Sequence, residues 1–312
     1  MMDLEIFLST HYKLDEKIIL ACSTGPDSIF LLHKILETKY KDNLVVCYFN
    51  HKLRPEADEE EIWIEKLGKK YGFKVEIAEA NIKEIRNKLY PSKGLEEVAR
   101  EKRYAFLNAI LNIYESDKVI TGHHLDDKIE TFFFNLVRGS KLTGLINMTE
   151  KSGAILRPLL NTEKKDILNY LKKNKLEYKI DETNFDTSIT RNKLRHDIIP
   201  KFEQINSNYK NNLNNLITYL EEVKENIDKQ IIEFLNKYPK NEFNITDYNS
   251  LSSLLQKEII RHIFYISNGK STIGLSEANI NEVIRFINGK GNKTVKEIKN
   301  MKLFKDNKVI KY

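Results

Sequence analysis

A short polar stretch near the start of the chain has the residue types that bind phosphate. It reads Ser23-Thr-Gly-Pro-Asp-Ser28 and follows a short apolar run. Backbone N–H groups and the dipole at a helix start favour anions, and hydroxyl groups donate to phosphate oxygens. It is not a Walker loop, because no Gly-Lys-Ser/Thr follows. The stretch predicts a nucleotide site with Asp27 as a magnesium ligand, and a generic turn of small residues is the alternative.

Two further polar stretches follow apolar runs, at Asn50-His-Lys-Leu-Arg-Pro55 and Gly122-His-His-Leu-Asp-Asp127. Asp127 and Glu130 are three residues apart, which places both carboxylates on one face of a helix. Such a pair can hold a substrate amine and then remove its proton, whereas an acidic helix start favoured by the dipole is the alternative.

The histidines of these stretches are weaker signals. His51 is expected to contact the nucleotide, and a hydrogen-bonded loop histidine is an equal alternative. A metal site at His123 and His124 is disfavoured, because adjacent residues entering a helix point in different directions and no third ligand is obvious.

The elements that position these residues alternate in a regular way. Apolar runs predict strands, and amphipathic spacing predicts the helix after each one. The expected strands are 17–23, 44–49, 73–78 and 118–122, and the expected helices are 28–39, 56–71, 95–112 and 125–137. In helix 56–71 the expected inner face is Ile62, Trp63 and Leu67. This alternation predicts an α/β fold with a parallel doubly wound sheet, whose ligands bind at the carboxyl ends of the strands.

The second part of the chain reads differently. A helix is expected over 161–175, and Pro200 suggests a boundary. The pattern then predicts a mostly helical domain, with helices from about Asn211 and over 251–266 and 276–288, and with a hairpin of 301–305 and 308–312. The expected domains are 1–205, which binds the nucleotide, and 206–312.

Composition limits the classes of protein. The 312 residues carry a formal charge of +6, and residues 1–140 are slightly acidic while the remainder is basic. A basic second half suits a polyanion, although a lysine-rich composition alone gives the same balance. Cys22 and Cys47 lie in apolar runs, which favours buried thiols in a reducing cytosol. No apolar run is long enough to cross a membrane, so we expect a cytoplasmic protein without a membrane partner.

Several stretches together resemble one enzyme family. The phosphate loop is similar to the Ser-Gly-Gly-x-Asp-Ser signature of the PP-loop ATP pyrophosphatases. The ordered motifs further resemble the tRNA(Ile)-lysidine synthases of that superfamily, densely from residue 17 to about 200. The motifs are 50–55, 94–104, 122–131, 138–139, 144–145, 157–160, 181–184 and 191–196.

The resemblance implies a ligase that uses ATP and Mg²⁺ to join free L-lysine to the wobble cytidine of tRNA(Ile) with a CAU anticodon. The cytosine C2 oxygen would attack the α-phosphate, and the lysine side-chain amine would then displace AMP from C2. The family's nucleotide-binding residues correspond to Ser23, Thr24, Gly25, Pro26, Asp27, Ser28 and His51. Its lysine-site or catalytic acids correspond to Asp127 and Glu130, its functional arginines to Arg103 and Arg195, and Asp27 joins the catalytic set. A homodimer is compatible with the sequence, which does not fix the oligomeric state.

The chain departs from the family pattern at Thr24, where glycine is usual. If this position needs a positive φ, a β-branched residue is strained there. The chain also resembles the shorter form of the family. Its last 24 residues carry eight lysines, one at every third position from Lys290 to Lys311. We expect these lysines, Lys302 and Lys305 among them, to contact tRNA. The alternative is that the segment only makes the protein more soluble.

Three other functions stay open. A PP-loop enzyme that thiolates tRNA would usually need catalytic cysteines or a cysteine-bound cluster, and the chain has two cysteines without a Cys-x-x-Cys pair. An amide synthetase with the same loop would not need a basic helical half. A nucleotide-binding or RNA-binding module without catalysis is supported by Thr24 alone.

Overall fold

The computed structural model describes residues 3–146, 148–179 and 190–312. The motif at 181–184 lies outside the described residues. The chain forms two compact units, Met1–Ile217 and Thr218–Tyr312. The division falls within a long helix, α11 (Tyr209–Asn236), whereas Pro200 lies in the first turn of α10 (Ile199–Ile205). Proline is tolerated there, because the first N–H groups of a helix have no partner within the helix.

The first unit is built on a six-stranded sheet with the order β3-β2-β1-β4-β6-β5. Its strands are β1 (Ile18–Ala21), β2 (Leu44–Asn50), β3 (Lys74–Glu79), β4 (Val119–Thr121), β5 (Lys151–Ser152) and β6 (Ile155–Leu156). The four predicted strands and the parallel arrangement are confirmed, and only β5 runs antiparallel. The sequence did not reveal β5 and β6, because two residues are too few to show a periodicity.

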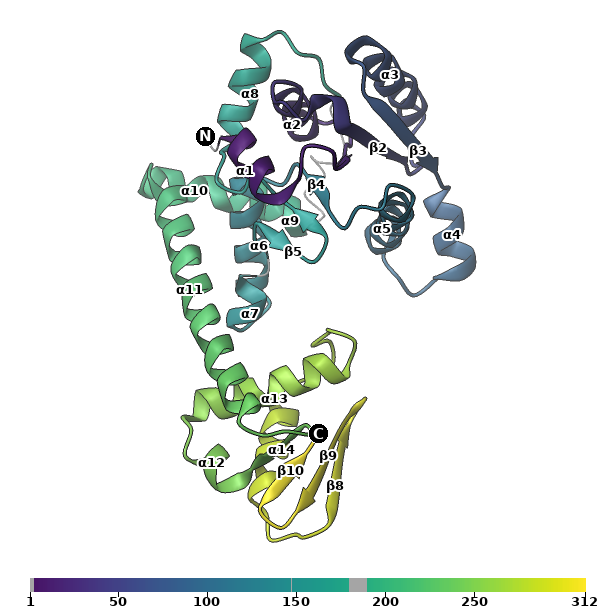
Figure 1. Cartoon of the computed structure of the whole chain (residues 1–312). Coiled ribbons are helices and arrows are strands. Elements are labelled where there is room, and N and C mark those ends of the chain that lie inside the picture. The colour runs from purple at the N-terminus through teal and green to yellow at the C-terminus, as the bar shows by residue number, and fades with distance from the viewer. Residues whose placement is uncertain (1–2, 147, 180–189) are drawn as a thin grey trace. The chain divides into compact units, whose positions relative to one another are not determined.

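Helices cover both faces of this sheet (Figure 1). The helices of this unit are α1 (Leu4–His11), α2 (Pro26–Leu36), α3 (Glu56–Tyr71), α4 (Ile82–Leu89), α5 (Leu95–Ile113), α6 (Leu125–Val137), α7 (Leu142–Leu145), α8 (Lys164–Lys173), α9 (Thr190–Lys193) and α10, with a short 3-10 helix at Lys41–Asn43 and a π-helical turn at Leu194–Ile198. Ile18 and Leu20 pack with α1, α2 and α8, whereas Ile19 packs against α5. Alternate residues of one strand are therefore buried on opposite faces, which explains its continuous apolar sequence.

The inner face of α3 was predicted wrongly in part. Ile62 is 54% exposed, while Ile64 is fully buried. Trp63 and Leu67 do pack at the edge of the core. The buried stripe is Ala57, Glu60, Ile64 and Gly68, and a glutamate and a glycine within it concealed the true face from an analysis of apolar spacing.

The second unit combines helices with a four-stranded antiparallel sheet. Its helices are α12 (Ile245–Asn249), α13 (Ser253–Ser267), α14 (Glu277–Asn288) and the end of α11, and its strands are β7 (Glu242–Asn244), β8 (Thr294–Ile298), β9 (Met301–Asp306) and β10 (Val309–Lys311). The strand order is β7-β10-β9-β8. The predicted helices and the hairpin around Asp306 and Asn307 are confirmed, and β7 and β8 extend that hairpin into a sheet.

Two smaller expectations have clear outcomes. Cys22 and Cys47 are buried free thiols. In the parts of the chain that the structure describes, no helix is both long and apolar enough to cross a bilayer.

Candidate functional site

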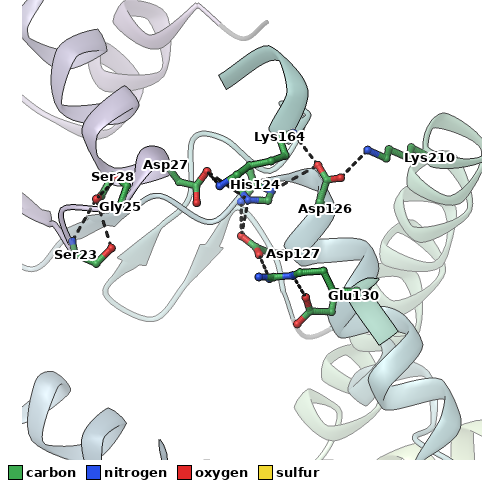
Figure 2. Close-up of polar contacts among 11 residues, drawn as sticks. Ser23, Gly25, Asp27, Ser28, His124, Asp126, Asp127, Glu130, Lys164 and Lys210 are labelled. Carbon is green, nitrogen blue, oxygen red and sulfur yellow. Dashed lines mark hydrogen bonds and ion pairs between the residues drawn. The ribbon is translucent and has the colours of Figure 1, made fainter. Parts of the chain in front are cut away.

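The phosphate loop lies between β1 and α2 and is closed by its own hydroxyl groups (Figure 2). Ser28 Oγ accepts from the backbone N–H of Ser23 at 3.2 Å and donates to the carbonyl of Gly25 at 2.9 Å. Gly25 is the residue before α2 and caps it with no side chain, and Pro26 occupies the first turn. The first N–H groups of α2 are therefore free of a side-chain cap, as an anion site at a helix start requires.

Thr24 adopts the backbone conformation that glycine usually supplies. Its φ is +62°, and the residue is fully buried. The left-handed region costs a residue with a Cβ about 1–2 kcal/mol. The sequence predicted strain here if the position needed a positive φ, and the positive φ is observed. The loop is therefore strained at Thr24.

The loop forms one wall of a cavity of about 430 Å³ at the carboxyl ends of the strands. Six of the predicted site residues line it, namely Ser23, Asp27, Ser28, His51, Arg103 and Asp127. Phe49, Tyr104 and Phe106 add aromatic surface. A cavity with a phosphate loop on one side and aromatic rings on another has the features of a nucleotide pocket.

A second cavity, of about 170 Å³, lies beside the start of α6. Its lining includes Asp126, Glu130, Arg195, Glu203 and Lys210. The predicted residues Glu130 and Arg195 thus face this cavity, whereas Asp127 faces the larger one.

Arg195 joins the two predicted carboxylates. Its Nε lies 2.7 Å from Glu130 Oε2, and its NH2 group lies 3.0 Å from Asp127 Oδ1. Burial raises the pKa of Glu130 above its ordinary value, although Arg195 opposes this effect. A carboxyl with a raised pKa is a better proton acceptor than an exposed one.

His124 lies among three carboxylates. Its Nε2 is 3.4 Å from Asp127 Oδ2 and 3.5 Å from Asp27 Oδ1, and its Nδ1 is 3.6 Å from Asp126 Oδ2. Burial alone would lower the pKa of His124, but Asp127 and Asp27 outweigh it and the pKa is raised. The ring therefore links the phosphate loop to α6 through its contacts with Asp27 and Asp127.

Two lysines complete the charge network. Lys164 Nζ lies 2.6 Å from Asp27 Oδ1, and Lys210 Nζ lies 2.6 Å from Asp126 Oδ1. Burial raises the pKa of Asp27, but His124 and Lys164 outweigh burial and hold it below its ordinary value. Asp27 is therefore ionised at neutral pH.

Arg103 and His123 belong to a separate group on the wall of the larger cavity. Burial lowers the pKa of Arg103. Burial lowers the pKa of His123, and the nearby positive charges of Arg157, Arg103 and Arg100 lower it further, to about 4. Asp127 acts in the opposite direction but does not outweigh them. His123 is thus neutral at pH 7, and its Nδ1 lies 2.8 Å from the hydroxyl of Thr121.

The structure reveals site residues that sequence reasoning missed. They are Glu60, His124 as a charged partner, Asp126, Lys164 and Lys210. Asp126 carried a signal, because it lies next to Asp127 in the same motif. The two lysines carried none, because each lies in the first turn of a helix far along the chain and is brought to the site only by packing.

The described residues do not form a metal site by themselves. Among the residues of 3–146, 148–179 and 190–312, no group of three or more His, Cys, Asp or Glu side chains is arranged to hold a metal ion. A magnesium ion at Asp27 would therefore need the phosphate oxygens of a ligand as well, which is the usual way that proteins bind Mg²⁺.

Comparisons with known proteins give a matching family model and named relatives. Residues 3–202 match the model of the PP-loop domain family. The tRNA(Ile)-lysidine synthase of Persephonella marina is 34% identical over 229 residues, which cover 70% of this chain and 50% of that protein. The enzyme of the same name from Mycoplasma mycoides is 30% identical over 302 residues, covering 93% of this chain and 72% of that protein.

The length of these relatives and the fold of a solved structure complete the comparison. The chain spans about half the length of the first curated relatives it matches. The U34-tRNA thiolase NcsA of Methanococcus maripaludis superposes with a TM-score of 0.55 at 18% identity, over 68% of this chain and 72% of that one. At that identity the likeness concerns the fold alone.

Proposed function

The chain belongs to the tRNA(Ile)-lysidine synthase family and carries its PP-loop domain, and from that premise we propose that it joins L-lysine to C2 of the wobble cytidine of tRNA(Ile) with a CAU anticodon. ATP would be consumed, and lysidine, AMP and pyrophosphate would form. The observation that carries the proposal is the network linking the phosphate loop to Asp127, Glu130 and Arg195.

The phosphate loop supports the first step. In that step the cytosine C2 oxygen attacks the α-phosphorus of ATP, and the bond to pyrophosphate breaks. The charge that develops on pyrophosphate needs donors already in place. The uncapped start of α2 and the hydroxyl group of Ser23 are such donors, and Lys164 adds a cation next to Asp27.

Asp27 suits a magnesium ion because its pKa is lowered and its carboxylate lies beside the loop. When bound, the ion would neutralise charge on the phosphate oxygens. Lys164 would compete with the ion for this carboxylate, because its Nζ lies 2.6 Å from Asp27 Oδ1.

The carboxylate pair supports the second step. The lysine side-chain nitrogen forms a bond to C2, the bond from C2 to the AMP oxygen breaks, and AMP leaves. The amine has an ordinary pKa of about 10.4 and must lose a proton before it attacks. Glu130, whose pKa is raised, is the proposed proton acceptor, and Arg195 fixes Glu130 and Asp127 in place.

The smaller cavity is the proposed place of free lysine. It offers the carboxylates of Asp126, Glu130 and Glu203 to ammonium groups, and the cations of Arg195 and Lys210 to a carboxylate. Free lysine carries both kinds of charge, so the two sets match the two ends of the substrate.

The second unit is the proposed tRNA contact, and here one expectation is corrected. Lys305 is only 6% exposed, and it donates to the carbonyls of Ile287 and Gly289 at the end of α14, so it supports the fold and does not contact RNA. Lys302 is exposed but pairs with Glu297 at 2.6 Å. Exposed lysines also occur at Lys290, Lys293, Lys308 and Lys311.

Thiolation is the nearest rival, and the cysteines oppose it. Both thiols are buried. Burial raises the pKa of Cys22, and it raises the pKa of Cys47 to about 12. A buried thiol that resists ionisation is a poor nucleophile. We therefore propose the ligase, with the cytoplasm as its place of action and free lysine and tRNA as its substrates.

The test is incorporation of radiolabelled lysine into tRNA(Ile) bearing the CAU anticodon, with ATP and magnesium. Methionine tRNA with the same anticodon is the control. Label in the isoleucine tRNA alone is expected. Pyrophosphate release stimulated by the tRNA without any label would contradict the lysine assignment and direct the search to another second substrate.

A further inference from the structure

Glu60 is a charged residue in the buried stripe of α3. The neighbours that share this stripe are Ala57, Ile64 and Gly68, which are apolar or small. A buried carboxylate is costly unless its oxygens are paired and hydrogen-bonded. The partners of Glu60 therefore indicate why a glutamate stands there.

Those partners come from separate segments at the carboxyl edge of the sheet. Glu60 Oε2 accepts a hydrogen bond from Thr24 Oγ1 at 2.8 Å and from the hydroxyl of Tyr48 at 3.1 Å. Glu60 Oε1 accepts one from Arg54 at 2.8 Å. One carboxylate thus connects the phosphate loop, the end of β2 and the segment between β2 and α3.

Glu60 contacts the phosphate loop at Thr24, where the loop backbone is strained. Thr24 is a β-branched residue with a φ of +62°, a conformation that glycine adopts freely. Its carbonyl accepts from the N–H of Lys179 at 3.0 Å, and its hydroxyl also lies 2.5 Å from the carbonyl of Ser23. Strained residues persist where surrounding contacts hold them, and the bond to Glu60 is such a contact.

We propose that Glu60 is a positioning residue that acts through Thr24. It holds the loop in the left-handed turn from which Ser23 and Ser28 face the nucleotide cavity. The threonine hydroxyl and the buried carboxylate together do what the free backbone of a glycine does in the usual motif. The proposal rests on the proposed function, because it takes ATP as the ligand of the loop.

The test is a double-mutant cycle on the affinity for ATP with magnesium, measured by calorimetry. Thr24→Val keeps the branched shape and removes the hydroxyl, and it is expected to weaken ATP binding about tenfold. Thr24→Ser restores the hydroxyl and is expected to recover most of that loss. Glu60→Gln is expected to weaken binding in the wild-type background and to add less than about threefold to Thr24→Val. Glu59→Gln, on the exposed side of α3, is the matched control.

Two results would overturn the proposal. The first is additive effects of Glu60→Gln and Thr24→Val, which would mean that Glu60 does not act through Thr24. The second is a Thr24→Ser protein that binds ATP as weakly as Thr24→Val. The second comparison keeps Glu60 intact, so it decides the question even if Glu60→Gln fails to fold.

Steady-state kinetics separate positioning from general destabilisation. Thr24→Val is expected to raise KM for ATP and to leave KM for lysine as in the control. A wild-type protein that binds ATP but incorporates no lysine would refute the proposed function, while the binding cycle would still test Glu60. A wild-type protein that does not bind ATP would refute both.

Discussion

The charged residues of the first unit and those of the second are held in different ways. At the site, Asp27 is paired with Lys164, which is 137 residues away in the chain, and Glu130 is paired with Arg195. On the sheet of the second unit, exposed lysines pair with nearby acids, as Lys302 does with Glu297. The site pairs are partly buried, whereas both partners of the Lys302–Glu297 pair are exposed. Water and salt screen an exposed pair more strongly than a partly buried one.

This difference predicts large effects of single substitutions in the first unit and small ones in the second. Glu130→Gln removes the proposed proton acceptor with little change of shape. We expect lysine incorporation to fall about 10²- to 10⁴-fold, because general base catalysis typically contributes that much. ATP binding should stay near that of the wild type. Glu97→Gln, an exposed residue of α5, is the control. Incorporation within threefold of wild type would contradict the role of Glu130.

Asp27→Asn is the next largest change. It removes the charge that Lys164 and His124 contact and the proposed ligand of magnesium. We expect pyrophosphate release to fall about 10²- to 10³-fold, as when one stabilising group for developing charge is removed. Release would be measured with saturating tRNA and a range of magnesium concentrations. An unchanged dependence on magnesium would argue against Asp27 as a ligand.

His124 predicts a pH dependence of stability. Its pKa is raised in the folded protein from an ordinary value of 6.5, so the protonated ring stabilises the fold. That contribution is fully present below pH 6.5 and is lost as the pH rises through the folded pKa. The free energy of unfolding of wild type minus that of His124→Gln should therefore be largest below pH 6.5 and decrease toward alkaline pH. Denaturant titrations at several pH values measure it, and a difference that grows with pH would refute the assignment.

The smallest effect is expected on the second unit. Lys302→Ala with Lys308→Ala should weaken tRNA binding only a few-fold at about 0.15 M salt and lower the slope of log affinity against log salt by about 2. Filter binding over a salt series measures both.

Lys305→Met is the contrast, because this lysine donates to two carbonyls inside the unit. It should lower stability by about 1–3 kcal/mol and leave the salt slope unchanged. An unchanged slope in the double variant would favour a solubilising role of the exposed lysines.

Much of the fold could be predicted from local sequence. Helix 56–71 and helix 125–137 have the predicted bounds, because their periodicity and their flanking residues act within a few residues. Strands of two residues have no such signal, which is why β5 and β6 were missed. The face of α3 was mistaken because Glu60 is buried through its partners and not through its own hydrophobicity.

The sequence by itself determined the alternation of strands and helices, the phosphate loop and the ordered motifs that carry the family resemblance. Only the tertiary structure decided which polar and charged side chains meet. Thr24 donates a hydrogen bond to Glu60, 36 residues away, and Lys210 pairs with Asp126, 84 residues away. The physical reason is range: propensity and periodicity depend on neighbours in the chain, whereas ion pairs and buried hydrogen bonds depend on how distant elements pack at the carboxyl edge of the sheet.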